Sequence, residues 1–151
     1  MRILCLALLS FALLGQPTPT PLEQWLGAPL VILPDAPPRT DGEAFIDNGV
    51  IFVPAAQLRA FRDPAEAARF LSHAAAHLKL RHGAEYQARM GTLERAAQFT
   101  FHFPLEKMEA ALRGQLETEA ATVAAEFLAK SGCAPGPCAM FGELLRAARL
   151  P

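Results

Sequence analysis

The stretch Asp63-Pro-Ala-Glu-Ala-Ala-Arg-Phe-Leu-Ser-His-Ala-Ala-Ala-His-Leu-Lys-Leu-Arg-His82 predicts the central helix of the protein. The aspartate at its start can cap the helix, and Pro64 suits the first helical position, where no backbone N–H is needed. Glu66 completes a capping box with the aspartate. Gly83 is expected to end the helix near residue 82.

A β-hairpin is predicted before this helix. The apolar runs at residues 44–46 and 50–53 flank Asp47-Asn48-Gly49, and Asn-Gly between two such runs is the strongest short signal for a tight hairpin. The other elements expected are a strand at residues 29–33 and helices at residues 22–26, 55–61, 84–99, 104–130 and 138–149. The fold class predicted is mainly α with a small β-hairpin, that is, an α+β domain.

The longest predicted helix has a regular apolar face. Its members recur three and four residues apart, which is the spacing of one helix face, and they are Leu105, Met108, Leu112, Leu116, Ala120, Val123 and Phe127. We therefore expect this face to pack into the core.

The N-terminus has the layout of a secretory signal peptide. Arg2 gives a positive start, residues 3–14 are almost unbroken apolar sequence, and Gly15 is the best small residue for cleavage. An N-terminal anchor or a buried helix is the alternative. We expect a signal peptide at 1–15, a Pro-rich leader at 16–28 and one domain at 29–151, with a secreted or periplasmic location. Many alanines and few lysines are typical of a GC-rich bacterial genome.

Two cysteines, Cys133 and Cys138, remain after the predicted cleavage. An even pair in an exported protein favours a disulfide, and the Ala-Pro-Gly-Pro between them is turn-forming. Free thiols and a redox pair are the alternatives, although redox enzymes use a C-x-x-C spacing.

Composition excludes several classes of protein. The chain has 14 basic and 15 acidic residues among 151, so it lacks the positive surplus that phosphate binding needs, and nucleic acid is not an expected partner. The mature chain contains no apolar run long enough to span a bilayer, which needs about 20 residues.

The candidate chemistry lies on the central helix. His73 and His77 are four residues apart, so both imidazoles lie on one face and can share a metal ion. The alternative is a pair of partly buried polar residues without a metal. His82 is five residues further and about 140° around the helix, so we do not expect it in the same site. His102 lies in the aromatic stretch Phe-Thr-Phe-His-Phe, which we expect in the core or lining a cleft.

The order of these elements resembles a known family. The hairpin, the helix with a His-x-x-x-His pair ending in Arg-His, and a later helix reading Glu117-Thr-Glu-Ala-Ala are similar to the HtpX-like and CAAX-prenyl-protease-type zinc metallopeptidases of the gluzincin group. The resemblance implies a zincin-like minimal metallopeptidase domain. It also implies a zinc ion bound by His73, His77 and Glu117.

Periodicity also favours Glu117 over Glu119 as the third ligand. Glu119 falls on the polar side of its helix, whereas Glu117 lies beside the core face among small residues. A carboxylate in that position needs a partner, because an unpaired buried charge is costly. A metal with two imidazoles is one such partner, and Arg113, one turn back, is the other.

Two departures from the family pattern point to impaired catalysis. The position of the general-base glutamate is Ala74, and the aspartate expected after the alanine of the later motif is Ala121. The function predicted is a non-catalytic, peptidase-like domain, or pseudoenzyme, that binds zinc or holds a peptide or protein segment in its cleft. An active but atypical zinc metalloendopeptidase and a metal-free helical interaction module are the alternatives.

Overall fold

The protein, in a computed structural model that describes residues 18–38, 44–131 and 136–149, is mainly helical with one small sheet. Its elements are α1 (Pro21–Leu26), β1 (Leu30–Leu33), β2 (Phe45–Asp47), β3 (Val50–Pro54), α2 (Ala55–Ala60), α3 (Pro64–Lys79), α4 (His82–Phe99), α5 (Leu105–Ser131) and α6 (Gly136–Arg149). The predicted signal peptide lies outside the described residues. So does the predicted disulfide, because Cys133 and the side chain of Cys138 are not described.

The sheet confirms the predicted hairpin and extends it by one strand. Asn48 and Gly49 have φ values of 47° and 81°, which are the two left-handed conformations that a type I′ turn requires. The strand order is β1-β3-β2, with β3 antiparallel to β2 and parallel to β1. The edge strand β2 is therefore open on one side among the described residues.

Helix α3 starts as the sequence predicts. Asp63 accepts a hydrogen bond from the backbone N–H of Glu66 at 2.9 Å, and Pro64 is the first helical residue. The carboxylate of Glu66 accepts the backbone N–H of Arg62 at 2.7 Å, one residue before the cap. The predicted capping pair is thus present with a shifted return bond.

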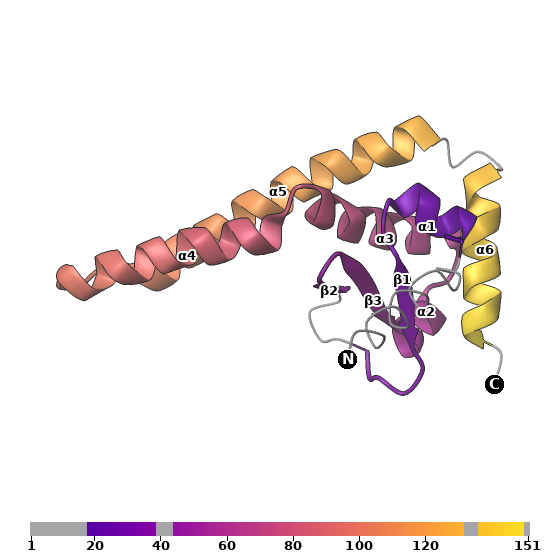
Figure 1. Cartoon of the computed structure of the whole chain (residues 1–151), viewed down its shortest axis with the longest axis horizontal. Coiled ribbons are helices and arrows are strands. Elements are labelled where there is room, and N and C mark those ends of the chain that lie inside the picture. The colour runs from indigo at the N-terminus through magenta and orange to yellow at the C-terminus, as the bar shows by residue number, and fades with distance from the viewer. Residues whose placement is uncertain (1–17, 39–43, 132–135, 150–151) are drawn as a thin grey trace, which may run out of the picture.

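The predicted end of this helix at Gly83 is wrong. Helix α3 ends at Lys79, and Arg81 takes a left-handed conformation with φ 56°. The next helix then begins at His82, so that Gly83 lies inside its first turn. The break lets α4 leave in a new direction, which Figure 1 shows.

The core surrounds α3 (Figure 1). The largest cluster of buried residues joins α3 to β3, α2 and α6, and Ile51, Leu58, Leu71 and Phe141 are fully buried in it. Helix α1 packs on the same cluster through Leu26, and the Trp25 ring contacts the Phe141 ring at a centroid distance of 5.1 Å. His73 and His77 therefore stand on the helix around which the core is built.

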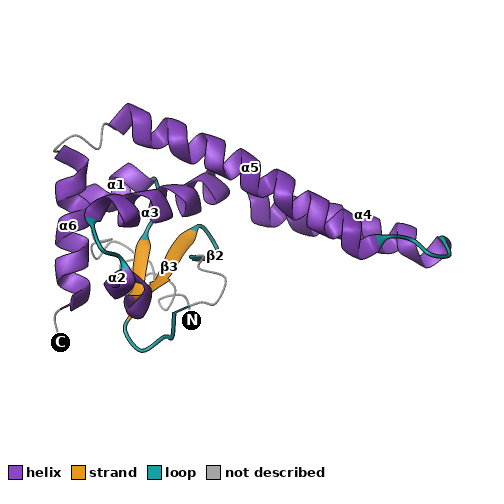
Figure 2. Ribbon diagram, turned by 180° about the vertical axis from the view of Figure 1, so that it is seen from behind, coloured by secondary structure: helices purple, strands orange, loops and turns teal. Residues whose placement is uncertain are grey.

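Helices α4 and α5 form a long antiparallel pair that projects from this core (Figures 1 and 2). We call residues 82–116 the helical arm. Met90, Leu112 and Leu116 form a separate buried cluster inside it. Among the described residues, no helix is both long and apolar enough to cross a membrane.

The tip of the arm contradicts two expectations. Phe99 and Phe101 are 88% and 90% exposed, and His102 is exposed with φ 61°, so the aromatic stretch lies neither in the core nor along a cleft. Met108 is 40% exposed, although it belongs to the predicted apolar face of α5. The reason is that only α4 faces this part of α5, and α4 ends at residue 99.

Candidate metal centre

Three side chains from two helices converge at the base of the arm. His73 and His77 lie one turn apart on α3, and Glu117 reaches them from α5. One ligand atom from each residue lies within 4.8 Å of the other two, so the group could hold a metal ion. The sequence analysis named these same three residues.

The distances within the group are those of donors around a small ion. His73 Nε2 lies 2.9 Å from one carboxylate oxygen of Glu117, and His77 Nε2 lies 3.2 Å from the other. The two Nε2 atoms are 3.1 Å apart. A tetrahedral ion with bonds of about 2.0–2.1 Å separates its ligands by about 3.3 Å, so only small adjustments are needed.

Small residues at the contact between α3 and α5 bring Glu117 within reach. Ala76, Ala120 and Ala124 form a buried cluster where the two helices meet. Alanine side chains allow the backbones to approach closely. Glu117 lies three residues before Ala120, so it faces α3 at the edge of this contact. Glu117 is therefore the carboxylate of α5 that lies close to both histidines, as the periodicity of the helix predicts.

The alternative partner of Glu117 is engaged elsewhere. Arg113 donates to the carboxylate of Glu109 at 2.9 Å and to the Tyr86 hydroxyl at 2.7 Å. The Tyr86 hydroxyl in turn donates to Glu109 at 2.7 Å. Arg113 thus belongs to a separate polar cluster that ties α4 to α5.

The electrostatics favour the protonation states that a metal ligand needs. Burial lowers the pKa of His77, and the nearby Glu117 carboxylate opposes this shift only in part. Burial tends to raise the pKa of Glu117, but its hydrogen bond with His73 and the charge of His77 reverse this, and the net pKa is lowered. Neutral imidazole and ionised carboxylate are the forms that bind metal ions.

His82 is not one of the three grouped residues, but its ring contacts that of His77. Its Nδ1 lies 3.0 Å from Nδ1 of His77, and its side chain is only 3% exposed. This contact is possible because α3 ends at Lys79, so that His82 does not continue the turn of that helix. His82 offers no ligand atom to the three-residue group. It lies on the Nδ1 side of the His77 ring, away from His73 and Glu117.

A pocket of 410 Å³ opens beside the two histidines. Its lining comes from α3 and from the segment at edge strand β2, and consists of Ala44, Ile46, Arg69, Phe70, His73, Ala74 and His77. Ala74, at the family's general-base position, is buried in this lining. Arg69 is the one residue with a permanent charge among these lining residues, and none of these described residues carries a carboxylate.

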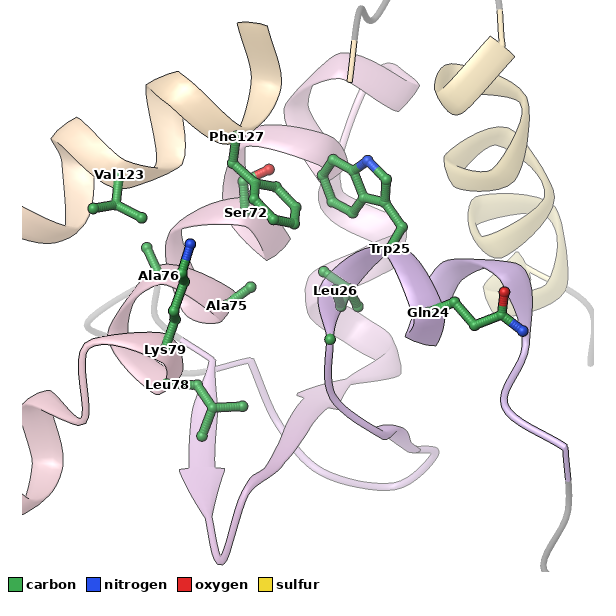
Figure 3. A pocket seen from close by; sticks show the side chains of 11 residues that line it. Gln24, Trp25, Leu26, Ser72, Ala75, Ala76, Leu78, Lys79, Val123 and Phe127 are labelled. Carbon is green, nitrogen blue, oxygen red and sulfur yellow. The ribbon is translucent and has the colours of Figure 1, made fainter. Parts of the chain in front are cut away.

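A second cavity of 340 Å³ lies on the other side of α3, next to α1 (Figure 3). Trp25, Val123 and Phe127 give it an apolar wall, and Lys79 is the one titratable residue of its described lining. Ser72 also lines it, but its hydroxyl already donates to the Ala68 carbonyl at 2.6 Å. The residues suited to metal chemistry are thus confined to the histidine side of α3.

Comparison of the chain with protein-family models, with curated proteins and with solved structures finds no match in any of the three.

Proposed function

We propose that the protein is a degenerate relative of the HtpX-like zinc metallopeptidases that keeps the zinc site and has lost proteolysis. The observation that carries the proposal is the convergence of His73, His77 and Glu117 from two helices. Two imidazole nitrogens and a carboxylate oxygen suit zinc, and three protein ligands leave a fourth position for water or another ligand.

The same geometry supports loss of catalysis. Zinc in such a site would polarise a bound water or carbonyl group, but a peptidase also needs a base that takes the proton from water and delivers it to the leaving amine. Ala74 can do neither, and the described residues that line the pocket include no carboxylate. The loss of general acid–base help typically costs ~100- to 10,000-fold in rate.

An active but atypical peptidase needs a replacement base, for which Glu119 is a candidate. Its Oε2 lies 3.5 Å from Nε2 of His82, and its Oε1 accepts the Gln115 amide at 2.8 Å. Glu119 is thus directed to the side of His77 that faces away from the ligand group. This arrangement favours the non-catalytic proposal.

A peptide or protein segment is the ligand class that we propose for the 410 Å³ pocket. Ala44 and Ile46 give the pocket an apolar wall, and the adjoining strand β2 has an unpaired edge among the described residues. An extended peptide can add to such an edge through backbone hydrogen bonds.

Metal content is the direct test of the zinc site. We expect purified protein to contain close to one zinc per chain, and His77→Ala to contain almost none. His102→Ala is the matched control, because this exposed histidine lies at the tip of the arm and should leave the zinc content unchanged. Equal metal content in His77→Ala and the unmodified protein would contradict the proposal and favour a metal-free module.

Restoring a general-base carboxylate at position 74 tests whether proton transfer is the step that the protein has lost. The pair Ala74→Glu and Ala121→Asp should create peptidase activity that a chelator abolishes, while the unmodified protein should show little or none. Chelator-sensitive cleavage by the unmodified protein would instead establish the atypical peptidase.

A further inference from the structure

We propose that His82, oriented by Glu119, is a positioning residue that holds His77 in the tautomer and orientation needed to bind the metal. This inference rests on the proposed zinc site. Histidine ligands usually donate their second nitrogen to a carboxylate or carbonyl group, and such partners strengthen the site. The aspartate that the family pattern would supply is Ala121, which is exposed on α5. His82 and Glu119 provide a different support.

The contact between the two rings sets the tautomer of His77. Its Nε2 faces His73 and Glu117, so this nitrogen must be unprotonated to bind a metal. The proton of neutral His77 then lies on Nδ1, which requires an acceptor. Nδ1 of His82 lies 3.0 Å away, and the rings meet edge to face at 80°. His82 can accept this hydrogen bond only through an unprotonated Nδ1.

The far side of His82 is oriented by a chain of polar groups. With Nδ1 accepting, Nε2 of His82 carries the proton, and Glu119 Oε2 lies 3.5 Å from it. Gln115 donates to the other oxygen of Glu119 at 2.8 Å, and Arg89 donates to Gln115 at 3.2 Å. Along the path from Arg89 on the arm to His77, each donor thus faces an acceptor, and the Glu119 carboxylate stands between two donors, Gln115 and His82.

The burial of His82 indicates that the residue has a function beyond packing. His82 is 3% exposed, and its Nε2 is buried without a hydrogen bond among the described residues, because 3.5 Å from Glu119 is long for one. A buried polar atom without a full partner costs free energy, typically ~1–3 kcal/mol. An apolar side chain would avoid that cost. A histidine in this position is therefore better explained by what it does for His77 than by packing.

The backbone also directs His82 toward α3. Arg81, a residue with a Cβ, adopts a left-handed conformation at the break between α3 and α4. Such a conformation costs about 1–2 kcal/mol for a residue other than glycine. It places His82 at the first position of α4, where its ring reaches back to His77.

The test compares His82→Asn with His82→Leu. The asparagine oxygen can replace Nδ1 as acceptor, whereas leucine has similar size and no acceptor. We expect His82→Leu to weaken zinc affinity ~10- to 100-fold and to alter the visible absorption spectrum of the cobalt(II)-loaded protein. His82→Asn should retain affinity and spectrum close to those of the unmodified protein. Unchanged affinity and spectrum in His82→Leu would overturn the inference while leaving the zinc site intact.

Two further measurements separate folding from positioning. If His82→Leu does not fold, Glu119→Ala replaces it, because this half-exposed residue can be removed with little loss of packing, and it should also lower zinc affinity. In metal-free protein, ¹⁵N chemical shifts should show His77 with its proton on Nδ1. The opposite tautomer would overturn the inference. Failure of the unmodified protein to bind zinc would overturn the proposed function, and the role assigned to His82 with it.

Discussion

The two ends of the helical arm differ in which kind of side chain they bury. At its base, His77 and His82 lie within the fold and their ring nitrogens are 3.0 Å apart. At its tip, Phe99 and Phe101 are almost fully exposed. Soluble proteins usually bury apolar residues and expose polar ones, so each end reverses the common pattern.

The two ends of the arm differ in how strongly contacts between side chains hold their residues in place. At the base, the ring nitrogens of His73 and His77 and the carboxylate oxygens of Glu117 lie about 3 Å from one another, so a change to one residue alters the others. At the tip, the aromatic rings make few contacts in the folded chain, so they contribute little to its stability. Variants along the arm can therefore separate residues that hold the fold from residues that do not.

The largest effect is expected from the buried part of the arm. Leu116→Ala removes a side chain that is 4% exposed, and we expect it to lower the free energy of unfolding by ~2–5 kcal/mol. Met108→Ala is the control on the same helix, and its 40% exposure predicts a change within about 0.5 kcal/mol. Urea unfolding followed by circular dichroism measures both. Equal losses would show that the tip is as well packed as the base.

Zinc should stabilise the protein only when the candidate metal group at the base of the arm is intact. An ion that binds only the folded state at 100 times its dissociation constant stabilises by about 2.7 kcal/mol. We expect zinc to raise the melting temperature of the unmodified protein and of His102→Ala, but not that of His73→Ala. A zinc-dependent rise in His73→Ala would place the ion elsewhere.

In the metal-free protein, lowering the pH should reduce the stability of the fold in two stages, through His77 and then through Glu117. The pKa of His77 is below its ordinary 6.5, so between these values the unfolded chain binds more protons, and stability falls as the pH drops below 6.5. Glu117 also has a lowered pKa, so its contribution is present above pH 4.5 and is lost as the pH falls further. Melting temperatures from pH 7.5 to 4 should decline less in a His77→Ala, Glu117→Gln double variant. Parallel curves would contradict this origin of the pH dependence.

The smallest effect on stability is expected at the tip. Phe99→Ser combined with Phe101→Ser should leave the melting temperature within a few degrees of the original, because both rings are already in solvent. Differential scanning calorimetry at matched concentration measures this. A large decrease would indicate that the rings pack against something in the folded protein, such as a second copy of the chain.

The sequence determined the local elements well. Asn48-Gly49 specifies its turn because both residues tolerate positive φ, and Asp63-Pro64 specifies a helix start through its cap. The spacing of His73 and His77 places both on one face of any helix that contains them. These features depend on residues close in the chain, so no knowledge of the tertiary structure was needed.

The third member of the candidate group was predictable for a related reason. Glu117 is close to the apolar face of α5 and Glu119 is further around it, so periodicity distinguished them before their surroundings were known. The parallel pairing of β1 with β3 was not predicted, because it joins residues that are distant in the sequence, such as Leu30 and Ile51. Sequence patterns identify strands more readily than their distant partners.

The surroundings of His82 and His102 depend on the tertiary structure. A helix continued to residue 82 would turn His82 away from the pair, but the left-handed Arg81 ends that geometry and brings the ring against His77. The aromatic neighbours of His102 suggested burial, yet the arm carries them beyond any element that could cover them. In both cases the local sequence is compatible with more than one environment, and the direction of the chain after α3 determines which environment is reached.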